Sequence, residues 1–486
     1  MNRKNSNSQK IFIGRSEELN LLEGLSRSRR SALVVIKGRR RVGKSRLVAE
    51  FAKNKRFLSF SGPSPIKDVS AQDQRDVFAN QLSALFHLPP FQFSDWLDGF
   101  AHLSMHLDNQ STIILFDEIS WMGSKDPTFI PKLKIWWDKI SEQKTNILLI
   151  LCGSVSTWIE DNIIKSTALF GRVSLHLTLN PLSISESYLL LKKNGVQASP
   201  YDIFRILSIM GGIPWYLENV QCDETIDQNI KRLCFSPSGL LANEFDLIFH
   251  DLFDKRGSVY KELITILAEG MRDYNEIRKS MNYPAGGGLS PYLNVLITSG
   301  YVNKHQSWSI KTGKPGAKSL FRLSDNYLRF YLKVIEPLLG KINLNAFRDA
   351  PLSSIPGWNS IMGIQIESLF LSNRQKVLKS IGIHPQDVVM DNPFIQHSTE
   401  AHKGVQIDYL IQTSTKTLYL CEIKFRKSEI QSEVLTDVQK KVEKLSIPKG
   451  YAVCPVLFHF SGVSDSVLDA RYFYRIIDFN DFLKDD

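Results

Sequence analysis

Runs of aliphatic residues predict a buried β-sheet in the first third of the chain. Three runs, Leu33–Ile36, Ile113–Phe116 and Ile147–Cys152, are apolar at every position and do not alternate with polar residues. Strands of this kind are typical of parallel sheets that helices cover on both faces. A further strand is expected at Arg56–Ser61. The pattern therefore predicts an α/β fold for this part of the chain.

The residues from Pro181 to about Phe253 show a helical period instead, and no alternating pattern interrupts it. Apolar residues recur every three or four positions, as on the buried face of an amphipathic helix. The helices predicted in this way are Ser183–Lys193, Asp202–Met210, Thr225–Phe235 and Leu240–Phe253. Between them, Gly211-Gly212-Ile213-Pro214 is expected to open one more helix, with proline in its first turn. We predict a helical lid.

A third pattern, three helices and a β-ribbon, covers the segment from Val259 to about Leu323. The predicted helices are Val259–Ala268, Tyr274–Met281 and Leu289–Ser299, and the strands are Tyr301–Lys304, Ser307–Lys311 and Ser319–Leu323. This order predicts a winged helix-turn-helix. The groups that could contact DNA are Ser290, Tyr292 and Asn294 on the third helix and Lys311, Lys314 and Lys318 on the wing. The third helix is poor in Arg and Lys, so a protein-contact module is the alternative.

The C-terminal part combines both kinds of pattern. Leu339–Pro356 is expected to be a linker, and a helix is expected at Trp358–Arg374. The strands Val405–Ile411 and Leu418–Phe425 are expected to pair as a hairpin, followed by the helix Glu433–Leu445. At 486 residues the chain is too long for one core. We therefore predict four domains: a P-loop ATPase core at 1–180, the lid at 181–256, the winged helix at 257–336 and an α/β nuclease-like domain at 337–486.

Composition narrows the possible partners. The apolar content of 43% and charged content of 23% are those of a folded globular protein. The net charge of +10 favours a polyanionic partner such as DNA. The longest apolar run is too short to cross a membrane, and the polar N-terminus predicts no secretory signal, so we expect a cytoplasmic protein without membrane contact. Five scattered cysteines predict neither a disulfide framework nor a zinc site.

The first aliphatic strand leads into a phosphate-binding loop. The residues Gly38, Arg39, Arg40, Arg41, Val42, Gly43, Lys44 and Ser45 spell G-x-x-x-x-G-K-S, and Arg46 continues into a helical pattern. This P-loop lies between a strand and a helix, the context in which its backbone N–H groups cradle phosphates. Lys44 is expected to reach the β- and γ-phosphates of ATP, and the Ser45 hydroxyl is expected to bind Mg²⁺.

Polar residues at the ends of two other strands complete the predicted ATP site. Asp117 and Glu118 follow the second aliphatic run, and the carboxyl ends of parallel strands are where such sheets bind ligands. Asp117 is placed to hold Mg²⁺ and Glu118 to polarise the attacking water. Ser154, after the third run, could sense the γ-phosphate, or be an ordinary turn serine. Arg172, in Phe170-Gly171-Arg172, is a candidate phosphate contact in its own or a neighbouring copy, or a surface residue.

The two C-terminal strands carry a second group of charges. Asp408 and the pair Glu422 and Lys424 lie on neighbouring strands, and Glu422 and Lys424 share one face because they are two residues apart. Carboxylates that converge with a lysine could hold Mg²⁺ and orient water for attack on a phosphodiester. Glu367 could add a ligand and Gln439 could line the same cleft. Each of these charges, taken alone, could instead lie on a solvated face.

In its motifs and their order, the chain resembles the archaeal-type ATPases, an AAA+/STAND-like family with a winged helix and a C-terminal restriction-endonuclease-like domain. The motifs are F-I-G-R-S-E-E-L, G-R-R-R-V-G-K-S, L-F-D-E, C-G-S, L-F-G-R, G-G-I-P-W-Y-L and D…E-I-K. The resemblance implies that Gly14, Arg15 and Pro214 lie near the adenine. It also implies that Asp408, Glu422 and Lys424 match a PD-(D/E)xK core, although Ile407 replaces the proline.

These observations lead to one expected function and two alternatives. We expect an ATP- and Mg²⁺-dependent ATPase that controls DNA binding or a metal-dependent nuclease, and that forms a homo-oligomer if Arg172 acts on a neighbour. The first alternative is a STAND-type signalling or DNA-binding regulator whose C-terminal domain does not cut. The second alternative is an ATPase that remodels proteins.

Overall fold

The computed structural model describes residues 11–28, 30–63, 69–154, 157–253, 257–284, 288–398 and 403–484. Contacts divide the chain into two compact units, Met1–Pro181 with Thr298–Gly300, and Leu182–Ile297 with Tyr301–Asp486. The division falls beside the first boundary expected from the sequence, at residue 180, and the four-domain organisation stays a prediction. The other three predicted domains lie together in the second unit. The polar segment 1–10 lies outside the described residues.

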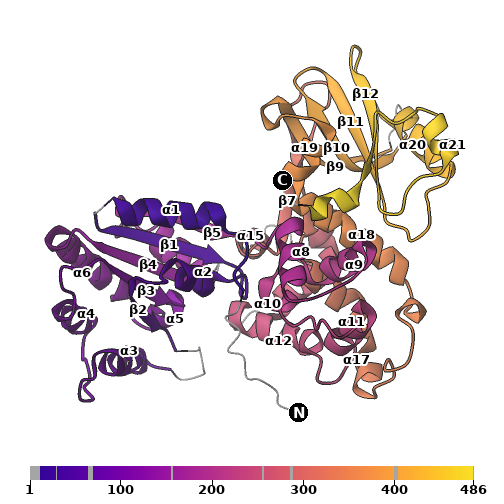
Figure 1. Cartoon of the computed structure of the whole chain (residues 1–486). Coiled ribbons are helices and arrows are strands. Elements are labelled where there is room, and N and C mark those ends of the chain that lie inside the picture. The colour runs from indigo at the N-terminus through magenta and orange to yellow at the C-terminus, as the bar shows by residue number, and fades with distance from the viewer. Residues whose placement is uncertain are drawn as a thin grey trace. The chain divides into compact units, whose positions relative to one another are not determined.

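A five-stranded parallel sheet forms the centre of the first unit, in the order β2-β3-β4-β1-β5 (Figure 1). Its strands are β1 (Ala32–Gly38), β2 (Arg56–Ser61), β3 (Thr112–Asp117), β4 (Ile147–Ser154) and β5 (Val173–Leu179). The four predicted strands are confirmed. The edge strand β5 was not predicted, because its apolar residues alternate with polar ones. Strand β4 lies between β1 and β3, so the P-loop strand and the acidic strand are not neighbours.

Helices bury both faces of this sheet, as the aliphatic runs predict. The helices of this unit are α1 (Ser16–Arg27), α2 (Lys44–Phe51), α3 (Ala71–Phe86), α4 (Trp96–Met105), α5 (Ile119–Gly123), α6 (Phe129–Gln143) and α7 (Thr157–Ile159). One core is rich in aromatic residues and includes Phe78 of α3, Phe100 of α4 and Trp136 of α6. The other core is aliphatic and includes Leu22 of α1 and Val48 of α2. Each face of the sheet is therefore covered by a hydrophobic core.

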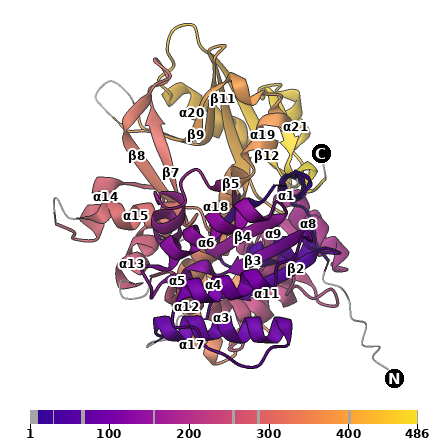
Figure 2. The ribbon, with the colours of Figure 1, turned by 90° about the vertical axis from the view of Figure 1, so that its left-hand side faces the viewer.

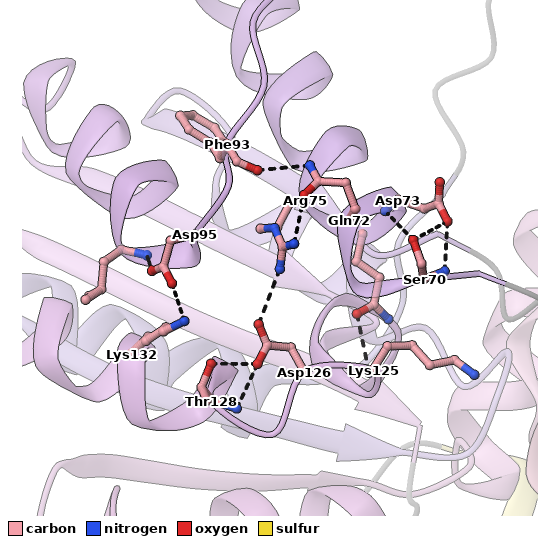
Figure 3. A network of polar contacts seen from close by, with 12 residues as sticks. Ser70, Gln72, Asp73, Arg75, Phe93, Asp95, Lys125, Asp126, Thr128 and Lys132 are labelled. Atoms are coloured by element: carbon pink, nitrogen blue, oxygen red, sulfur yellow. Dashed lines mark hydrogen bonds and ion pairs between the residues drawn. The ribbon is translucent and has the colours of Figure 1, made fainter.

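A polar network ties α3, α4 and α6 together beside the aromatic core (Figure 3). The ammonium of Lys132 on α6 pairs with Asp95, the residue that caps α4. Arg75 on α3 lies 3.4 Å from Asp126, just before α6. Gln74, only 2% exposed, donates to the Trp121 carbonyl at 2.6 Å. These contacts fix the segment that follows the acidic strand β3.

Gly62 marks the closest backbone approach in this region. Its N–H donates to the Asp117 carbonyl at 3.0 Å. A Cβ at this position would lie 2.6 Å from the Met122 nitrogen and 2.8 Å from the Glu118 carbonyl oxygen. Both of these atoms belong to the backbone of α5 or its start, so they have no side-chain rotamer with which to make room. Only glycine lets the chain pass here.

The second unit begins with the predicted helical segment. Its helices are α8 (Ile184–Lys193), α9 (Pro200–Met210), α10 (Pro214–Leu217), α11 (Ile226–Cys234) and α12 (Leu240–Phe253). Serine or threonine side chains cap α8, α9 and α11 at Ser183, Ser199 and Thr225. Such caps satisfy the free N–H groups of a first helical turn. The predicted helices are confirmed, including the one that Pro214 opens.

The three predicted helices follow in order, and a three-stranded sheet accompanies them whose first strand, between the first two helices, was not predicted. They are α13 (Gly257–Ala268), β6 (Arg272–Asp273), α14 (Tyr274–Ser280), α15 (Leu289–Thr298), β7 (Val302–Trp308) and β8 (Pro315–Leu323). The two short strands predicted at 301–311 are one strand, β7. The sheet order is β6-β8-β7.

The β7–β8 hairpin does not project freely, because it packs along β9 (Val388–Gln396) (Figure 2). The Trp308 indole donates to the Gln412 side chain at 2.7 Å, and Gln412 donates to the Ile310 carbonyl at 2.9 Å. Trp308 and Ile310 also share the hydrophobic core of the C-terminal sheet. The hairpin is therefore an integral part of the C-terminal layer.

The predicted linker at 339–356 is partly wrong. One helical run continues from α16 (Asn326–Phe330) through a π-helical turn, Tyr331–Ile335, into α17 (Glu336–Asn343). The Glu336 N–H bonds to the Tyr331 carbonyl, five residues back. Pro337 lacks an N–H and crowds the preceding turn, and such strain is relieved by a wider helical turn. The proline bends the hydrogen-bond pattern without ending the helix.

The C-terminal part of this unit is a mixed five-stranded sheet in the order β13-β12-β11-β10-β9. Beside β9, its elements are α18 (Trp358–Ser372), α19 (Arg374–Ile381), β10 (Val405–Thr413), β11 (Thr417–Lys424), α20 (Glu433–Lys444), β12 (Ala452–His459), α21 (Asp465–Asp469) and β13 (Arg475–Asp478). The predicted antiparallel pairing of β10 and β11 is confirmed, whereas β12 and β13 add parallel strands. In the described ranges, no helix is long and apolar enough to span a membrane.

We predict that Gly62→Ala destabilises the first unit, because the new Cβ meets only backbone atoms. Overpacking of this kind typically costs about 1–3 kcal/mol. The measurement is the thermal unfolding midpoint. The matched control is Gly24→Ala on the exposed side of α1, where nothing lies within 4 Å of the new Cβ. The control should gain roughly 0.5–1 kcal/mol, because alanine stabilises a helix interior relative to glycine. Equal effects of the two changes would contradict the close approach.

Candidate functional site

The P-loop closes around the ammonium of Lys44. This side chain is 6% exposed and donates to the carbonyls of Gly38 and Arg39, each at 3.0 Å. Gly43 has a left-handed backbone, with φ of 96°. A Cβ on Gly38 would lie 2.7 Å from the Leu179 carbonyl of the neighbouring strand β5. The two glycines of the motif are therefore required by this geometry.

Burial lowers the pKa of Lys44, while the nearby carboxylates of Glu118 and Asp117 act in the opposite direction. The ammonium is thus desolvated but stays within the field of two negative charges. A buried cation in such a place is attracted to a polyanionic ligand.

The other loop residues lie where the motif predicts them. Val42 is buried in the aliphatic core and anchors the loop. Arg39, Arg40 and Arg41 are half-buried on the loop. Arg46, in the first turn of α2, donates to the Ile11 carbonyl at 2.5 Å. The proposed contacts of these arginines with nucleotide stay predictions.

Ser45 and Asp117 meet although they are 72 residues apart in the chain. The Ser45 hydroxyl donates to Asp117 Oδ2 at 2.6 Å. Ser45 comes from the start of α2 and Asp117 from the end of β3, on the far side of β4. A hydroxyl and a carboxylate that converge are oxygen ligands of the type that Mg²⁺ prefers. The residues present therefore fit a magnesium ion at this point.

Glu118 lies directly beyond, in a left-handed backbone conformation with φ of 47°. Its Oε2 atom is buried and has no hydrogen-bond partner. Burial raises the pKa of Glu118, Lys44 lowers it, and Asp117 raises it further. The backbone N–H of Ser154 donates to the Glu118 carboxylate. An under-satisfied carboxylate with a raised pKa is a candidate general base.

Ser154 is the last residue of β4 and lies, as expected, at the carboxyl ends of the strands. It is paired there with Gly38 of β1. Strands β1 and β3 are the two neighbours of β4. It is the backbone of Ser154 that contacts Glu118. Its position between the P-loop strand and the acidic strand is compatible with the predicted sensor role, which remains a prediction.

Gly14 and Arg15 lead into α1 and are tied to the loop. Both have left-handed backbones, with φ of 69° and 62°. Arg15 donates to the Asn180 carbonyl at 2.5 Å and to the Val42 carbonyl at 3.4 Å. Ser16 is the first residue of α1, and Arg15 holds the cap position without a side-chain cap bond. Arg15 thus connects the start of α1 to the P-loop and to the residue that follows β5.

Arg172 is far from the P-loop of its own chain. It lies just before β5, whose first residue Val173 pairs with Leu33 at the start of β1. The P-loop begins at the other end of β1, roughly 17 Å away at about 3.3 Å per residue. Arg172 instead makes a two-point ion pair with Asp138 on α6, at 2.5 and 2.9 Å. The expectation of a contact within one chain is therefore wrong; the contact with a neighbouring copy stays a prediction.

Pro214 belongs to the second unit, where it opens α10 after Gly212. The Gly212 carbonyl accepts a hydrogen bond from the Leu182 N–H at 2.7 Å. Its predicted place near an adenine stays a prediction.

The charged residues of the C-terminal sheet come together as predicted, around a lysine that was not predicted. Lys441 of α20 lies 2.5 Å from Glu422 Oε2 and 3.4 Å from Asp408 Oδ1. Lys424 lies 2.8 Å from Glu422 Oε1, and the Ile423 N–H donates to Asp408 Oδ2 at 3.2 Å. Gln439, predicted to line this cleft, is exposed. Lys441 shares the buried face of α20 with Val434 and Val438, seven and three residues earlier, which is the signal that could have identified it.

Glu367 of α18 lies at the margin of this cluster. Burial raises the pKa of Glu367 to about 7; Arg322 lowers it and Asp408 raises it. The Arg322 guanidinium lies 3.6 Å from the Glu367 carboxylate. Burial and the Glu422 charge raise the pKa of Asp408. Among the residues that the structure describes, no group of three or more His, Cys, Asp or Glu side chains could hold a metal ion.

Known proteins resemble this chain in sequence and in fold. Residues 12–220 match the model of a family described as an ATPase domain predominantly from Archaea. The chain is 23% identical to an uncharacterized protein of Methanocaldococcus jannaschii over 454 residues, which cover 91% of this chain and 95% of that protein. The structure of a Walker-type ATPase of Pyrococcus abyssi has a similar fold, with a TM-score of 0.51 and 17% identity over 66% of this chain and 96% of that one.

We predict that Glu118→Gln raises the thermal unfolding midpoint at pH 8. The raised pKa means that the folded state favours the protonated carboxyl, so this favourable contribution is present at low pH and is lost as the pH rises through the folded-state pKa. The amide never ionises and avoids that loss. The gain should therefore shrink toward pH 4.

The matched control for this measurement is Glu17→Gln, an exposed position in the first turn of α1. Its midpoint should stay close to that of the wild type at both pH values, because exposed substitutions usually change stability by less than about 0.5 kcal/mol. A lower midpoint for Glu118→Gln at pH 8 would contradict the burial argument.

Proposed function

We propose that this chain, whose residues 12–220 match an ATPase domain found predominantly in Archaea, binds and hydrolyses ATP with Mg²⁺. The observation that carries the proposal is the 2.6 Å contact of Ser45 with Asp117 beside the buried ammonium of Lys44. A glycine-rich turn that matched the motif by chance would not be expected to place its serine beside a carboxylate 72 residues away. The proposed reaction is phosphoryl transfer to water.

Each residue has a separate proposed part in this reaction. The N–H groups at the start of α2 bind the phosphate oxygens, and Lys44 exchanges its two carbonyl partners for the β- and γ-phosphates. Ser45 and Asp117 would hold Mg²⁺, which neutralises charge on the phosphates when it is bound. Glu118 orients the attacking water and accepts its proton, for which an unpartnered carboxylate oxygen is available. Ser154 is proposed as the sensor of the γ-phosphate.

A second copy of the chain is the proposed source of the arginine contact. Arg172 precedes β5 at the end away from the P-loop, next to Phe170, which is 81% exposed. We propose that this exposed ring packs against the second copy. In this proposal the chain forms a homo-oligomer in which Arg172 leaves Asp138 and contacts phosphate bound by its neighbour.

We propose that the nucleotide state controls DNA binding by the second unit. The order of α13, α14, α15 and the β7–β8 hairpin supports a winged helix-turn-helix. Ser290 and Asn294 are exposed on α15, whereas Tyr292 packs on Tyr260 with a ring distance of 5.2 Å. Lys311 and Lys314 are exposed and suited to phosphates.

Two interpretations of the C-terminal sheet remain proposals. The convergence of Asp408, Glu422 and Lys424 favours a nuclease-like domain whose metal would lie between Asp408 and Glu422, and Glu367 would have to move toward them to add a ligand. The ion pairs of Lys441 with the same carboxylates favour the alternative, a signalling or DNA-binding regulator that does not cut.

We predict that Lys44→Ala abolishes ATP hydrolysis and weakens ATP binding at least tenfold, because the loop loses the cation that faces the phosphates. Calorimetry with ATP and Mg²⁺ measures binding, and phosphate release measures turnover. The control is Lys53→Ala, a surface lysine 54% exposed that should leave both unchanged. Wild-type turnover by the folded Lys44→Ala protein would contradict the proposed site.

We predict that the double change Lys311→Glu and Lys314→Glu weakens binding to duplex DNA and lowers its salt dependence. The slope of log K against log salt falls by about 1 for each lysine that no longer neutralises a phosphate. Fluorescence anisotropy at several salt concentrations, with and without ATP, measures both effects. Lys192→Glu with Lys193→Glu on exposed positions of α8 makes the same charge change and is the control. Equal weakening in the two double variants would argue against a specific role of the hairpin in DNA binding.

A further inference from the structure

The four carboxylate oxygens of Asp408 and Glu422 all have a partner within the chain. Lys441 approaches one oxygen of each residue, at 3.4 Å for Asp408 and 2.5 Å for Glu422. Lys424 approaches the other Glu422 oxygen at 2.8 Å, and the Ile423 N–H approaches the other Asp408 oxygen at 3.2 Å. The ammonium of Lys441 approaches both carboxylates at once, so it bridges β10 and β11.

A divalent metal ion bound at this cluster would also be a cation that bridges the two carboxylates. Mg²⁺ needs oxygen ligands at about 2.0–2.1 Å and keeps several waters. Such an ion would need the oxygens that Lys441 contacts, and two cations cannot share them without strong repulsion. The charges are already balanced, since two ammoniums face two carboxylates. Glu422, with its side chain 3% exposed, gains nothing electrostatically from a further positive charge.

The backbone of α20 holds Lys441 in this place. Val434 and Val438 are buried in the core shared with β10 and β11, and Leu445 anchors the end of the helix. The stem of Lys441 leaves the helix on the same side as these residues. Moving its ammonium away would leave Asp408 and Glu422 without their shared partner in a buried place, which is costly.

We propose that Lys441 is an internal cation that takes the place of a metal ion in the C-terminal sheet, so that the folded chain does not bind a divalent metal between Asp408 and Glu422. The cluster is a closed ion-pair network, and removal of Lys441 converts it into a metal site. This inference concerns only the second unit and does not rest on the proposed ATPase.

The test is Mn²⁺ binding to the full chain without nucleotide, measured by the loss of the free-ion electron paramagnetic resonance signal. Lys441→Met keeps an unbranched side chain that is one atom shorter and removes its charge. We expect this variant to bind one more Mn²⁺ per chain than the wild type, at least tenfold more tightly than any site of the wild type. The additional site should disappear in Lys441→Met with Glu422→Gln.

The matched control is Lys440→Met, an exposed lysine one position earlier on α20, which should bind Mn²⁺ as the wild type does. A second measurement does not depend on the folding of the Lys441 variant: Glu422→Gln alone should leave Mn²⁺ binding unchanged from the wild type. The proposal is overturned if wild-type binding falls on Glu422→Gln, or if folded Lys441→Met gains no site. Both measurements omit ATP, so their failure would be distinct from failure of the ATPase assignment.

Discussion

The first unit depends on one constraint, the burial of the Lys44 ammonium at the carboxyl ends of the parallel strands. Lys44 is 6% exposed, and an ammonium in such a place is unstable unless polar groups surround it. Its carbonyl partners come from the loop itself, so the backbone has to close around the side chain. That closure needs a left-handed Gly43 and a Gly38 that leaves room for Leu179. The lysine, the glycines and the edge strand β5 are thus parts of one physical requirement.

The two units arrange lysine and carboxylates in opposite ways. In the first unit Lys44 bonds to backbone carbonyls and not to the carboxylates. Asp117 therefore accepts a hydrogen bond from Ser45, and one oxygen of Glu118 has no partner. In the second unit Lys441 bonds directly to the carboxylates. An unpartnered buried oxygen stores free energy that a ligand can recover, whereas a fully paired cluster has none to offer. The first arrangement is open to a ligand and the second is closed.

Features encoded by neighbouring residues could be predicted from the sequence, whereas contacts between distant segments could not. The aliphatic strands could be predicted because a strand buried on both faces is a run of consecutive apolar residues. The P-loop has a fixed motif, and Asp117 directly follows one of the apolar runs. The partners of Arg172 and of the C-terminal carboxylates could not be predicted, since ion pairs join residues from separate elements. Strand β5 alternates like many surface segments, and the start of the predicted linker at 339–356 is helical, because the helix continues through a π-helical turn. Lys441 carried a usable signal in its helical spacing from Val434 and Val438, which the prediction did not use.

Burial decides which of the ion pairs in this chain can exchange partners. The pair of Arg172 with Asp138 is partly exposed, with side chains 30% and 33% accessible, so solvent screens it in part and a phosphate could replace the carboxylate at a lower cost than in a buried pair. The pair of Lys441 with Glu422 is shielded by the core, and separating it leaves a buried charge uncompensated. Similar side chains at similar distances therefore have different consequences. The partly exposed pair is suited to a contact made and broken during a reaction cycle, and the pair that includes the buried Glu422 is suited to a fixed part of the fold.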